Sequence, residues 1–277
     1  GQENGKFSPR PLADGELADV LTRWQETLGE RGWNALYLEN HDQPRAVARF
    51  GDPQNAWFES ATALATAYFL QRGTPFIYQG QEIGMLGGQF TRPTDFRDVE
   101  SLNYLRAHTG DDMPAGLAAI SRDNGRTPMQ WDSSPNAGFT SGTPWIDVPA
   151  SASHINVEAQ LEDPSSVYAY YRALIEARHR VPALTVGSFE RIDAGDPALF
   201  IYQRSCEGSA VLVAVNLSGC AIIPSGALID EAFPSSRWNL YLGNTVDSHS
   251  DTEQETLNPA PASSMAPWEA RVYLAAR

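Results

Sequence analysis

The pattern of apolar residues changes once along this chain, and that change constrains the fold more than any other feature. Before Pro182, apolar residues recur at helical spacing in segments that alternate with short apolar runs. This alternation is expected of a parallel sheet or an α/β barrel. After Pro182, apolar and polar residues alternate with a period of two between turn residues, which favours antiparallel strands. We therefore expect an α/β part at residues 1–182 and a separate antiparallel β domain at residues 183–277.

The helices predicted before Pro182 begin at capping residues and end at glycine or proline, and strands lie between them. In chain order, the predicted elements are a helix capped by Asp14 and ended by Gly29 or Gly32, a strand at Trp33–Leu38, a helix opened by Asp52–Pro53 and ended by Gly73, a strand at Pro75–Gln79, short helices at Val99–Arg106 and Ala115–Ile120, and a helix from Asp163–Pro164 to Pro182.

Beyond Pro182 the period of two predicts short antiparallel strands. They are expected at Gly187–Asp193, Ala198–Arg204, Ala210–Leu217, Arg237–Leu242 and Glu269–Ala275. Cys206 and Cys220 flank a hairpin with its turn near Glu207-Gly208, and Cys220 would pair well down the partner strand. A disulfide between them is therefore disfavoured, and a reduced, cytoplasmic setting is expected.

The first predicted strand ends abruptly in polar residues. Ala35–Leu38 is apolar, Glu39-Asn40-His41-Asp42 follows, and Pro44 prevents a simple continuation. Strands of parallel sheets are buried on both faces and read as continuous apolar runs, and their carboxyl ends carry the chemistry of α/β folds. His41 and Asp42 are therefore candidate site residues, the alternative being that they cap the next element or hold a loop.

Composition limits the class of ligand. The net charge of −14 argues against a nucleic-acid partner and disfavours strongly anionic substrates, although a local basic pocket could overrule the second point. No apolar run approaches the roughly 20 residues that span a bilayer, so no membrane partner is expected. Cysteine and histidine spacing predicts no metal site. A small neutral molecule fits best.

Residues 85–160 form a long irregular segment, rich in glycine, proline, aspartate and arginine. Such a segment is uncommon in a compact domain unless it is functional or disordered. Its tryptophan, phenylalanine and arginine residues argue against disorder. We expect a structured loop that covers a site.

These residues carry a resemblance to a known family. Leu38–Arg45 resembles the asparagine-histidine-aspartate motif after barrel strand seven of the α-amylase family (glycoside hydrolase family 13). Gly73-Thr74-Pro75, with Gly80 and Glu82, matches the strand-eight pattern of that family. Ser121–Asp132 closely resembles a segment of its oligo-1,6-glucosidase and α-glucosidase branch. Three ordered motifs followed by a β module make the resemblance specific, and it extends over essentially the whole chain.

The resemblance implies a fold. It corresponds to the C-terminal part of a (β/α)8 TIM barrel, with the last two strands and their flanking helices in residues 1–182. The segment at about 85–160 would be a substrate-capping loop. Residues 183–277 would form an antiparallel β-sandwich domain.

The resemblance also implies residue roles. Asp42 aligns with the aspartate that binds the 2- and 3-hydroxyls of the sugar being cleaved and so stabilises an oxocarbenium-like transition state. His41 aligns with a neighbouring hydrogen-bond donor, and Arg126 with an arginine that closes the pocket at the non-reducing end. Glu39 is expected to shape the next sugar subsite. Glu82 occupies a position that the family uses structurally.

The implied activity is that of a glycoside hydrolase, a retaining exo-acting α-glucosidase on short neutral oligosaccharides, without a cofactor. In this family the nucleophile and the acid/base lie after strands four and five, and no glycine-x-arginine-x-aspartate stretch precedes Asp42. The chain alone is therefore expected to be inactive and to require the N-terminal half of the same enzyme, or to self-associate. Alternatives are a non-catalytic fragment that binds sugar weakly, a trehalose-6-phosphate hydrolase, or a sucrose-type transglycosylase. Calcium, if the complete enzyme binds it, is not encoded here.

Overall fold

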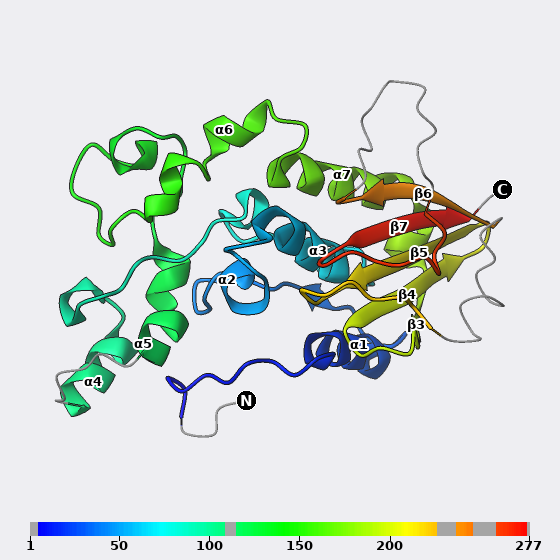
Figure 1. Cartoon of the computed structure of the whole chain (residues 1–277), viewed down its shortest axis with the longest axis horizontal. Coiled ribbons are helices and arrows are strands. Elements are labelled where there is room, and N and C mark those ends of the chain that lie inside the picture. The colour runs from blue at the N-terminus through cyan, green and yellow to red at the C-terminus, as the bar shows by residue number, and fades with distance from the viewer. Residues whose placement is uncertain (1–4, 109–114, 226–236, 246–258, 276–277) are drawn as a thin grey trace. The chain divides into compact units, whose positions relative to one another are not determined.

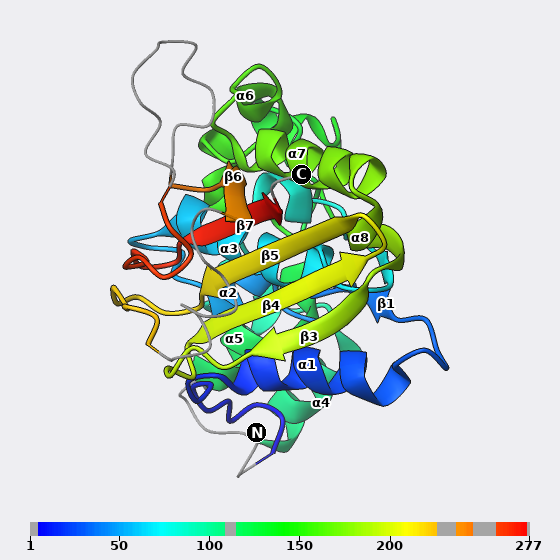
Figure 2. The same ribbon diagram turned by 90° about the vertical axis from the view of Figure 1, so that its right-hand side faces the viewer.

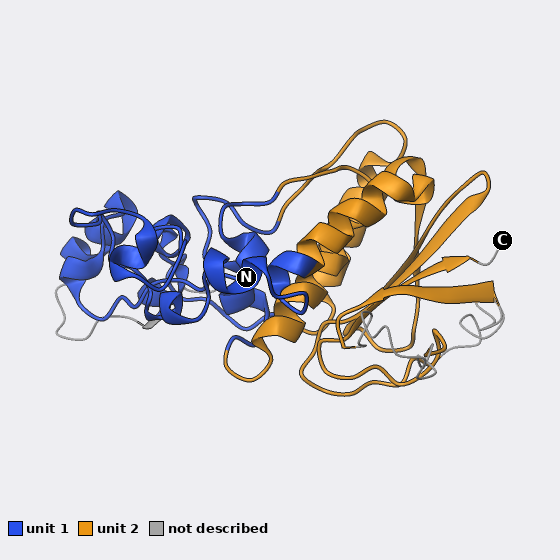
Figure 3. Cartoon of the chain, turned by 90° about the horizontal axis from the view of Figure 1, so that it is seen from above, with its two compact units in different colours: residues 1–12, 38–53, 77–169 blue, residues 13–37, 54–76, 170–277 orange. Residues whose placement is uncertain are grey.

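A computed structural model describes residues 5–108, 115–225, 237–245 and 259–275. They divide into two compact units whose segments interleave along the chain (Figure 3). Unit 1 comprises residues 1–12, 38–53 and 77–169, and unit 2 comprises residues 13–37, 54–76 and 170–277. The domain division at residues 182 and 183 stays a prediction.

An antiparallel sheet dominates unit 2 (Figure 2), and its strands confirm the five predicted from the period of two to within a residue or two at each end. In spatial order it contains β3 (Ser188–Ile192), β4 (Leu199–Cys206), β5 (Ser209–Asn216), β7 (Ala270–Ala275) and β6 (Trp238–Gly243).

The predicted hairpin turn is confirmed. Cys206 pairs with Ser209, so Glu207 and Gly208 form a two-residue turn, and Gly208 has a φ of 71°. The prediction that Cys220 pairs along the partner strand is wrong, because β5 ends at Asn216, whose side-chain amide donates to the Cys220 carbonyl 2.7 Å away. Both cysteines are free, as expected.

Both faces of this sheet are covered, but a second sheet covers neither of them in the described residues. Alternate residues of β4 point to opposite sides: Ile201 packs into a core with Tyr273 and Met265, whereas the hydroxyl of Tyr202 donates to the Thr66 carbonyl of α3 (Trp57–Phe69). The predicted β-sandwich is therefore seen as one sheet. α3 and α8 (Pro182–Val186) pack against its strands.

Unit 2 also contains α1 (Glu16–Leu28), most of α7 (Val167–Arg180) and a parallel pair of strands, as predicted. β1 (Ala35–Leu36) pairs with β2 (Thr74–Pro75). Both strands are shorter than the sequence predicts. Tyr37 and Phe76, predicted to be buried strand residues, are 52% and 55% exposed. The reason is that in the described residues β1 and β2 pair with no further strand, so their flanks lack the neighbours that bury a parallel sheet.

Several predicted helix boundaries are wrong. The N-cap of α1 is Gly15 rather than Asp14, in a left-handed conformation with φ of 78°, at a point where a Cβ would lie 2.8 Å from the Pro197 carbonyl oxygen. The N-cap of α3 is Ala56, beyond the predicted Asp52–Pro53 start, and α7 begins at Val167, after Asp163–Pro164. Gly29 does end α1.

Unit 1 is built from short helices and 3-10 turns (Figure 1). They are α2 (Ala46–Phe50), η1 (Gln81–Ile83), η2 (Pro93–Asp95), α4 (Val99–Ala107), α5 (Ala115–Ile120), η3 (Arg122–Arg126), η4 (Pro135–Gly138), η5 (Ala150–Ser153) and α6 (Val157–Leu161). The two short helices predicted in this region, α4 and α5, are confirmed. Phe90, Phe96 and Leu117 belong to one buried cluster, and Ile83 and Met129 to another. Much of the irregular segment is therefore ordered around apolar cores.

Within the described ranges, every helix falls short of the length and apolar character that a membrane span requires.

Candidate functional site

The segment from Glu39 to Ala46 is a tight loop in unit 1 that presents Asp42. The Asn40 side-chain oxygen accepts a hydrogen bond of 2.8 Å from the backbone N–H of Asp42, as in an Asx turn. The Glu39 carboxylate accepts a second bond of 2.8 Å from the backbone N–H of Ala46 and so joins the two ends of the loop. Local hydrogen bonds therefore fix where the Asp42 side chain starts.

A buried ion pair supports this loop. Glu39 Oε2 lies 3.0 Å from Arg45 Nη1, and the two side chains are 2% and 1% exposed. Arg45 also donates a bond of 2.7 Å to the Gln79 carbonyl. Burial raises the pKa of Glu39, and the charge of Arg45 opposes that rise. The structure thus places Glu39 under the loop, while its predicted role in a sugar subsite stays a prediction.

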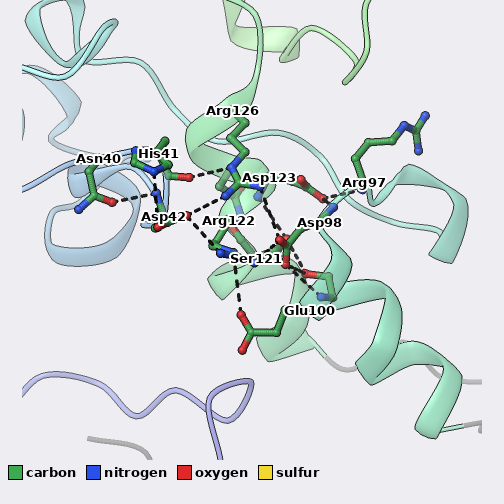
Figure 4. Close-up of polar contacts among 12 residues, drawn as sticks. Asn40, His41, Asp42, Arg97, Asp98, Glu100, Ser121, Arg122, Asp123 and Arg126 are labelled. Atoms are coloured by element: carbon green, nitrogen blue, oxygen red, sulfur yellow. Dashed lines mark hydrogen bonds and ion pairs between the residues drawn. The ribbon is translucent and has the colours of Figure 1, made fainter.

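A second segment of unit 1, η3, brings two arginines to Asp42 (Figure 4). The Ser121 hydroxyl accepts a bond of 3.3 Å from the Asp123 N–H at the start of this turn. Gly125 allows the close approach of the segments, because a Cβ there would lie 2.6 Å from the Gln43 carbonyl oxygen. Tyr78 donates its hydroxyl to the Gly125 carbonyl at 2.9 Å.

Two other predicted site residues, Arg126 and His41, lie next to Asp42. Arg126 Nη2 donates a bond of 2.7 Å to Asp42 Oδ1, and Arg126 Nε donates a bond of 2.8 Å to the His41 carbonyl. His41 Nε2 lies 3.5 Å from Asp42 Oδ2. The structure adds Arg122, whose Nη1 lies 3.2 Å from Asp42 Oδ1. The sequence signal for Arg122 was its place in the same motif as Arg126.

A second aspartate, Asp98, completes a cluster of four charges with Asp42, Arg122 and Arg126. Its Oδ1 lies 2.6 Å from Arg122 Nη2 and 3.5 Å from Arg126 Nη1. Asp98 is also the N-cap of α4, since its Oδ2 accepts a bond of 3.0 Å from the Ser101 N–H. Sequence reasoning missed Asp98, because an aspartate before a helix is ordinarily only a cap.

The contacts set the ionisation of the two aspartates. Partial loss of solvation would raise the pKa of Asp42, but the hydrogen bond from Arg126 and the charges of His41 and Arg122 outweigh it and leave that pKa below the usual value. The same balance, with burial opposed by the Ser101 and Arg122 hydrogen bonds, lowers the pKa of Asp98. Hydrogen bonding to Asp98 raises the pKa of Arg122. The directions of these shifts favour the charged forms of Asp42, Asp98 and Arg122.

Asp42 opens into a cavity of about 460 Å³ in unit 1. Its side chain is 46% exposed, in contrast to the 2% of Asp98. Besides Asp42, the cavity walls include an amide, an aromatic ring and three cations: Gln43, Phe50, Lys6, Arg10 and Arg49. The site thus combines an ionised acceptor with donors and an apolar surface, a composition that suits a polyhydroxylated ligand.

No metal site was predicted from the sequence. In the part of the chain that the structure describes, no group of histidine, cysteine, aspartate and glutamate side chains is arranged to hold a metal ion.

Comparison with known proteins places this geometry in context. Residues 2–187 match the alpha-amylase catalytic domain. The chain is 42% identical over 275 residues to the oligo-1,6-glucosidase of Parageobacillus thermoglucosidasius, covering 97% of this chain and 47% of that protein. It is 45% identical over 207 residues to the trehalose-6-phosphate hydrolase of Escherichia coli K12, covering 73% and 38%.

A solved structure shows the same similarity. The trehalose-6-phosphate hydrolase of Bacillus licheniformis aligns with a TM-score of 0.84 and 34% identity, over 98% of this chain and 48% of the other. The chain spans about half the length of the curated relatives that it matches over nearly all its residues.

Proposed function

The chain belongs to the α-amylase family, and we propose that it is the C-terminal portion of a retaining, exo-acting α-glucosidase that releases terminal glucose from short α-linked oligosaccharides. The observation that carries this proposal is the half-exposed Asp42 carboxylate, held by Arg126 and Arg122 at the wall of a cavity. In this proposal the α/β part of the chain is the last portion of a (β/α)8 barrel, and residues of about 85–160 cap its substrate.

Asp42 is the proposed transition-state stabiliser. Its lowered pKa keeps it ionised, and an ionised carboxylate is a strong acceptor for sugar hydroxyls. Such hydrogen bonds tighten as positive charge develops on the sugar ring, which lowers the barrier to glycosidic cleavage. Because both arginines bond to Oδ1, Oδ2 is the oxygen with capacity left for a hydroxyl. His41 and Arg126 are the proposed neighbouring donors to the same terminal sugar.

Retaining hydrolysis requires two further carboxylates about 5 Å apart, one as nucleophile and one as acid/base. We propose that the N-terminal half of the same enzyme supplies both, a division supported by relatives of about twice this length. The fragment on its own would then bind sugar weakly without cleaving it, or self-associate. Hydrolysis of a chromogenic α-glucoside by this chain alone would contradict that division.

Turnover by the completed enzyme tests the role of Asp42. This chain, co-expressed with the N-terminal half of the Parageobacillus enzyme, is expected to hydrolyse p-nitrophenyl α-glucoside. The change Asp42→Asn should lower kcat by roughly 1,000-fold or more, because it removes a charge that acts in the transition state. Asp95→Asn is the matched control, since Asp95 pairs with Arg92 rather than with the cluster. Near-normal turnover by the Asp42 variant would overturn the assignment.

A phosphorylated glucoside is a second candidate substrate. The cavity beside Asp42 has Lys6, Arg10 and Arg49 in its walls, the kind of local basic pocket that could overrule the acidic net charge. Trehalose-6-phosphate hydrolases are among the relatives. If this candidate is right, the completed enzyme will prefer trehalose 6-phosphate to isomaltose, and Arg49→Gln will raise KM for the phosphorylated substrate only. Equal loss on both substrates would exclude it.

A further inference from the structure

Each arginine of the four-charge cluster uses its two terminal nitrogens on two different carboxylates. Arg122 points Nη1 at Asp42 and Nη2 at Asp98, at 3.2 and 2.6 Å. Arg126 does the reverse, with Nη2 at Asp42 and Nη1 toward Asp98, at 2.7 and 3.5 Å. A guanidinium is planar, so contacts at both terminal nitrogens fix its orientation as well as its position.

The two carboxylates differ in how firmly they are held. Asp98 is 2% exposed and its second oxygen is occupied by the N–H and the hydroxyl of Ser101, whereas Asp42 is 46% exposed. Arg122 and Arg126 each link the two aspartates. Asp98 is the buried, fixed carboxylate of each link, and Asp42 is the carboxylate that a ligand can reach.

A third carboxylate holds Asp98 itself. Asp123 is fully buried, and its Oδ2 accepts backbone bonds of 2.7 Å from Arg97 and 3.0 Å from Asp98 (Figure 4). The hydroxyls of Ser101 and Ser121 lie 2.9 Å apart and join the same two segments. The start of α4 and the turn η3 are thus locked together beneath the arginines.

We propose that Asp98 is a positioning residue that holds Arg122 and Arg126 against Asp42, so that Oδ2 of Asp42 is the oxygen offered to a sugar hydroxyl. Its effect on sugar binding rests on the proposed function of Asp42, whereas the hold on the arginines does not. Asp98 touches no substrate in this scheme; it acts through the two guanidinium groups.

Two substitutions separate this role from helix capping. In Asp98→Asn, the amide oxygen can still cap Ser101, but the amide NH2 then faces the guanidinium groups and accepts nothing from them. In Asp98→Ser, the short hydroxyl is a good N-cap and leaves the arginines without a partner there. Both variants are expected to keep α4 folded, and the Ser101 amide proton reports this by its hydrogen exchange.

The rate of rotation about the Cζ–Nε bond of each arginine, measured by 15N NMR, shows directly how strongly Asp98 restrains the guanidinium group. In the unsubstituted chain, rotation is expected to be slow for Arg122 and Arg126, because both terminal nitrogens of each guanidinium lie within ion-pair distance of a carboxylate. In both Asp98 variants it should be at least tenfold faster. Asp95→Asn should speed rotation only at Arg92, which it pairs with. Unchanged rates at Arg122 and Arg126 would overturn the proposal.

Binding of D-glucose, followed through the Asp42 amide signal, reads out the consequence. We expect affinity to fall about tenfold in the Asp98→Asn and Asp98→Ser variants and to stay unchanged in Asp95→Asn. Faster arginine rotation with unchanged glucose affinity would refute the positioning role. If neither the unsubstituted chain nor its complex with the N-terminal half of the Parageobacillus enzyme responds to glucose, the proposed function of Asp42 fails, and the rotation rates still decide whether Asp98 holds the arginines.

Discussion

Arg126 and Asp42 lie 84 positions apart in the sequence, and their side chains meet with Nη2 2.7 Å from Oδ1. Because Asp42 is nearly half exposed, water screens this pair and its contribution to folding stability is small. The pair lowers the pKa of Asp42, and together with Arg122 it places two donors at one oxygen of that carboxylate.

We expect Arg126→Met to raise the pKa of Asp42 toward its usual value, because the main hydrogen bond to the ionised form is lost. A titration of the Asp42 carboxyl carbon by NMR measures this. Since the pKa of Asp42 is lower in the folded chain, any stability it contributes is present above about pH 4 and is lost as the pH falls through the folded pKa. Arg92→Met is the control and should move Asp95 alone; a static Asp42 would contradict the prediction.

Removal of the Glu39 carboxylate should destabilise unit 1 strongly. Glu39→Ala leaves Arg45 charged and buried without its ion-pair partner, a situation that typically costs about 3–5 kcal/mol. Urea denaturation measures the free energy of unfolding. Glu176→Ala is the control, because Glu176 forms an exposed pair with Arg180, and it should cost less than about 0.5 kcal/mol. Similar losses in both variants would refute a supporting role for Glu39.

Glu82 should make stability depend on pH. Burial raises its pKa, and its Oε2 is buried without a hydrogen-bond partner among the described residues. A raised folded pKa favours folding below about pH 4.5, and this contribution is lost as the pH rises through the folded pKa. Glu82→Gln should therefore stabilise the chain by about 1 kcal/mol at pH 7, with little gain at pH 4. Urea denaturation at both pH values would show it, and an equal effect at both would contradict it.

Arg204 of β4 is a structural cation in unit 2. Although fully buried, it donates bonds of 2.8–3.2 Å to the carbonyls of Leu70, Leu184, Gly187 and Ser188. Burial lowers its pKa to about 10. Arg204→Met should cost at least about 3 kcal/mol in the free energy of unfolding, because buried carbonyls lose their donors. The exposed Arg180 gives the control, Arg180→Met; equal costs would refute the prediction.

The sequence predicted regular elements best where a strong hydrophobic period met turn residues. The strands after Pro182 and the Glu207-Gly208 turn are cases in which local pattern and final structure agree. Helix starts were less predictable. Asp14 and Asp52–Pro53 are good starts locally, but α1 begins after Gly15, where Pro197 packs against the backbone, and α3 begins at Trp57.

Burial of the parallel strands could not be predicted from their own residues. Tyr37 and Phe76 lie in apolar runs, yet both are more than half exposed, because burial depends on which other strands and helices are present to cover them. An apolar run shows which residues of a segment can be buried, but it does not specify which other strands or helices will cover them.

By itself, the sequence determined the helix-strand alternation, the change to antiparallel strands and the motifs that bring Asp42, His41 and Arg126 into one family pattern, because each depends on residues close together in the chain. Only the tertiary structure decided that Arg122 and Arg126 bridge Asp42 to the buried Asp98, and that Glu39 pairs with Arg45 beneath the loop. The physical reason is that charge pairing depends on distance in space and on burial, and neither is determined by local sequence spacing.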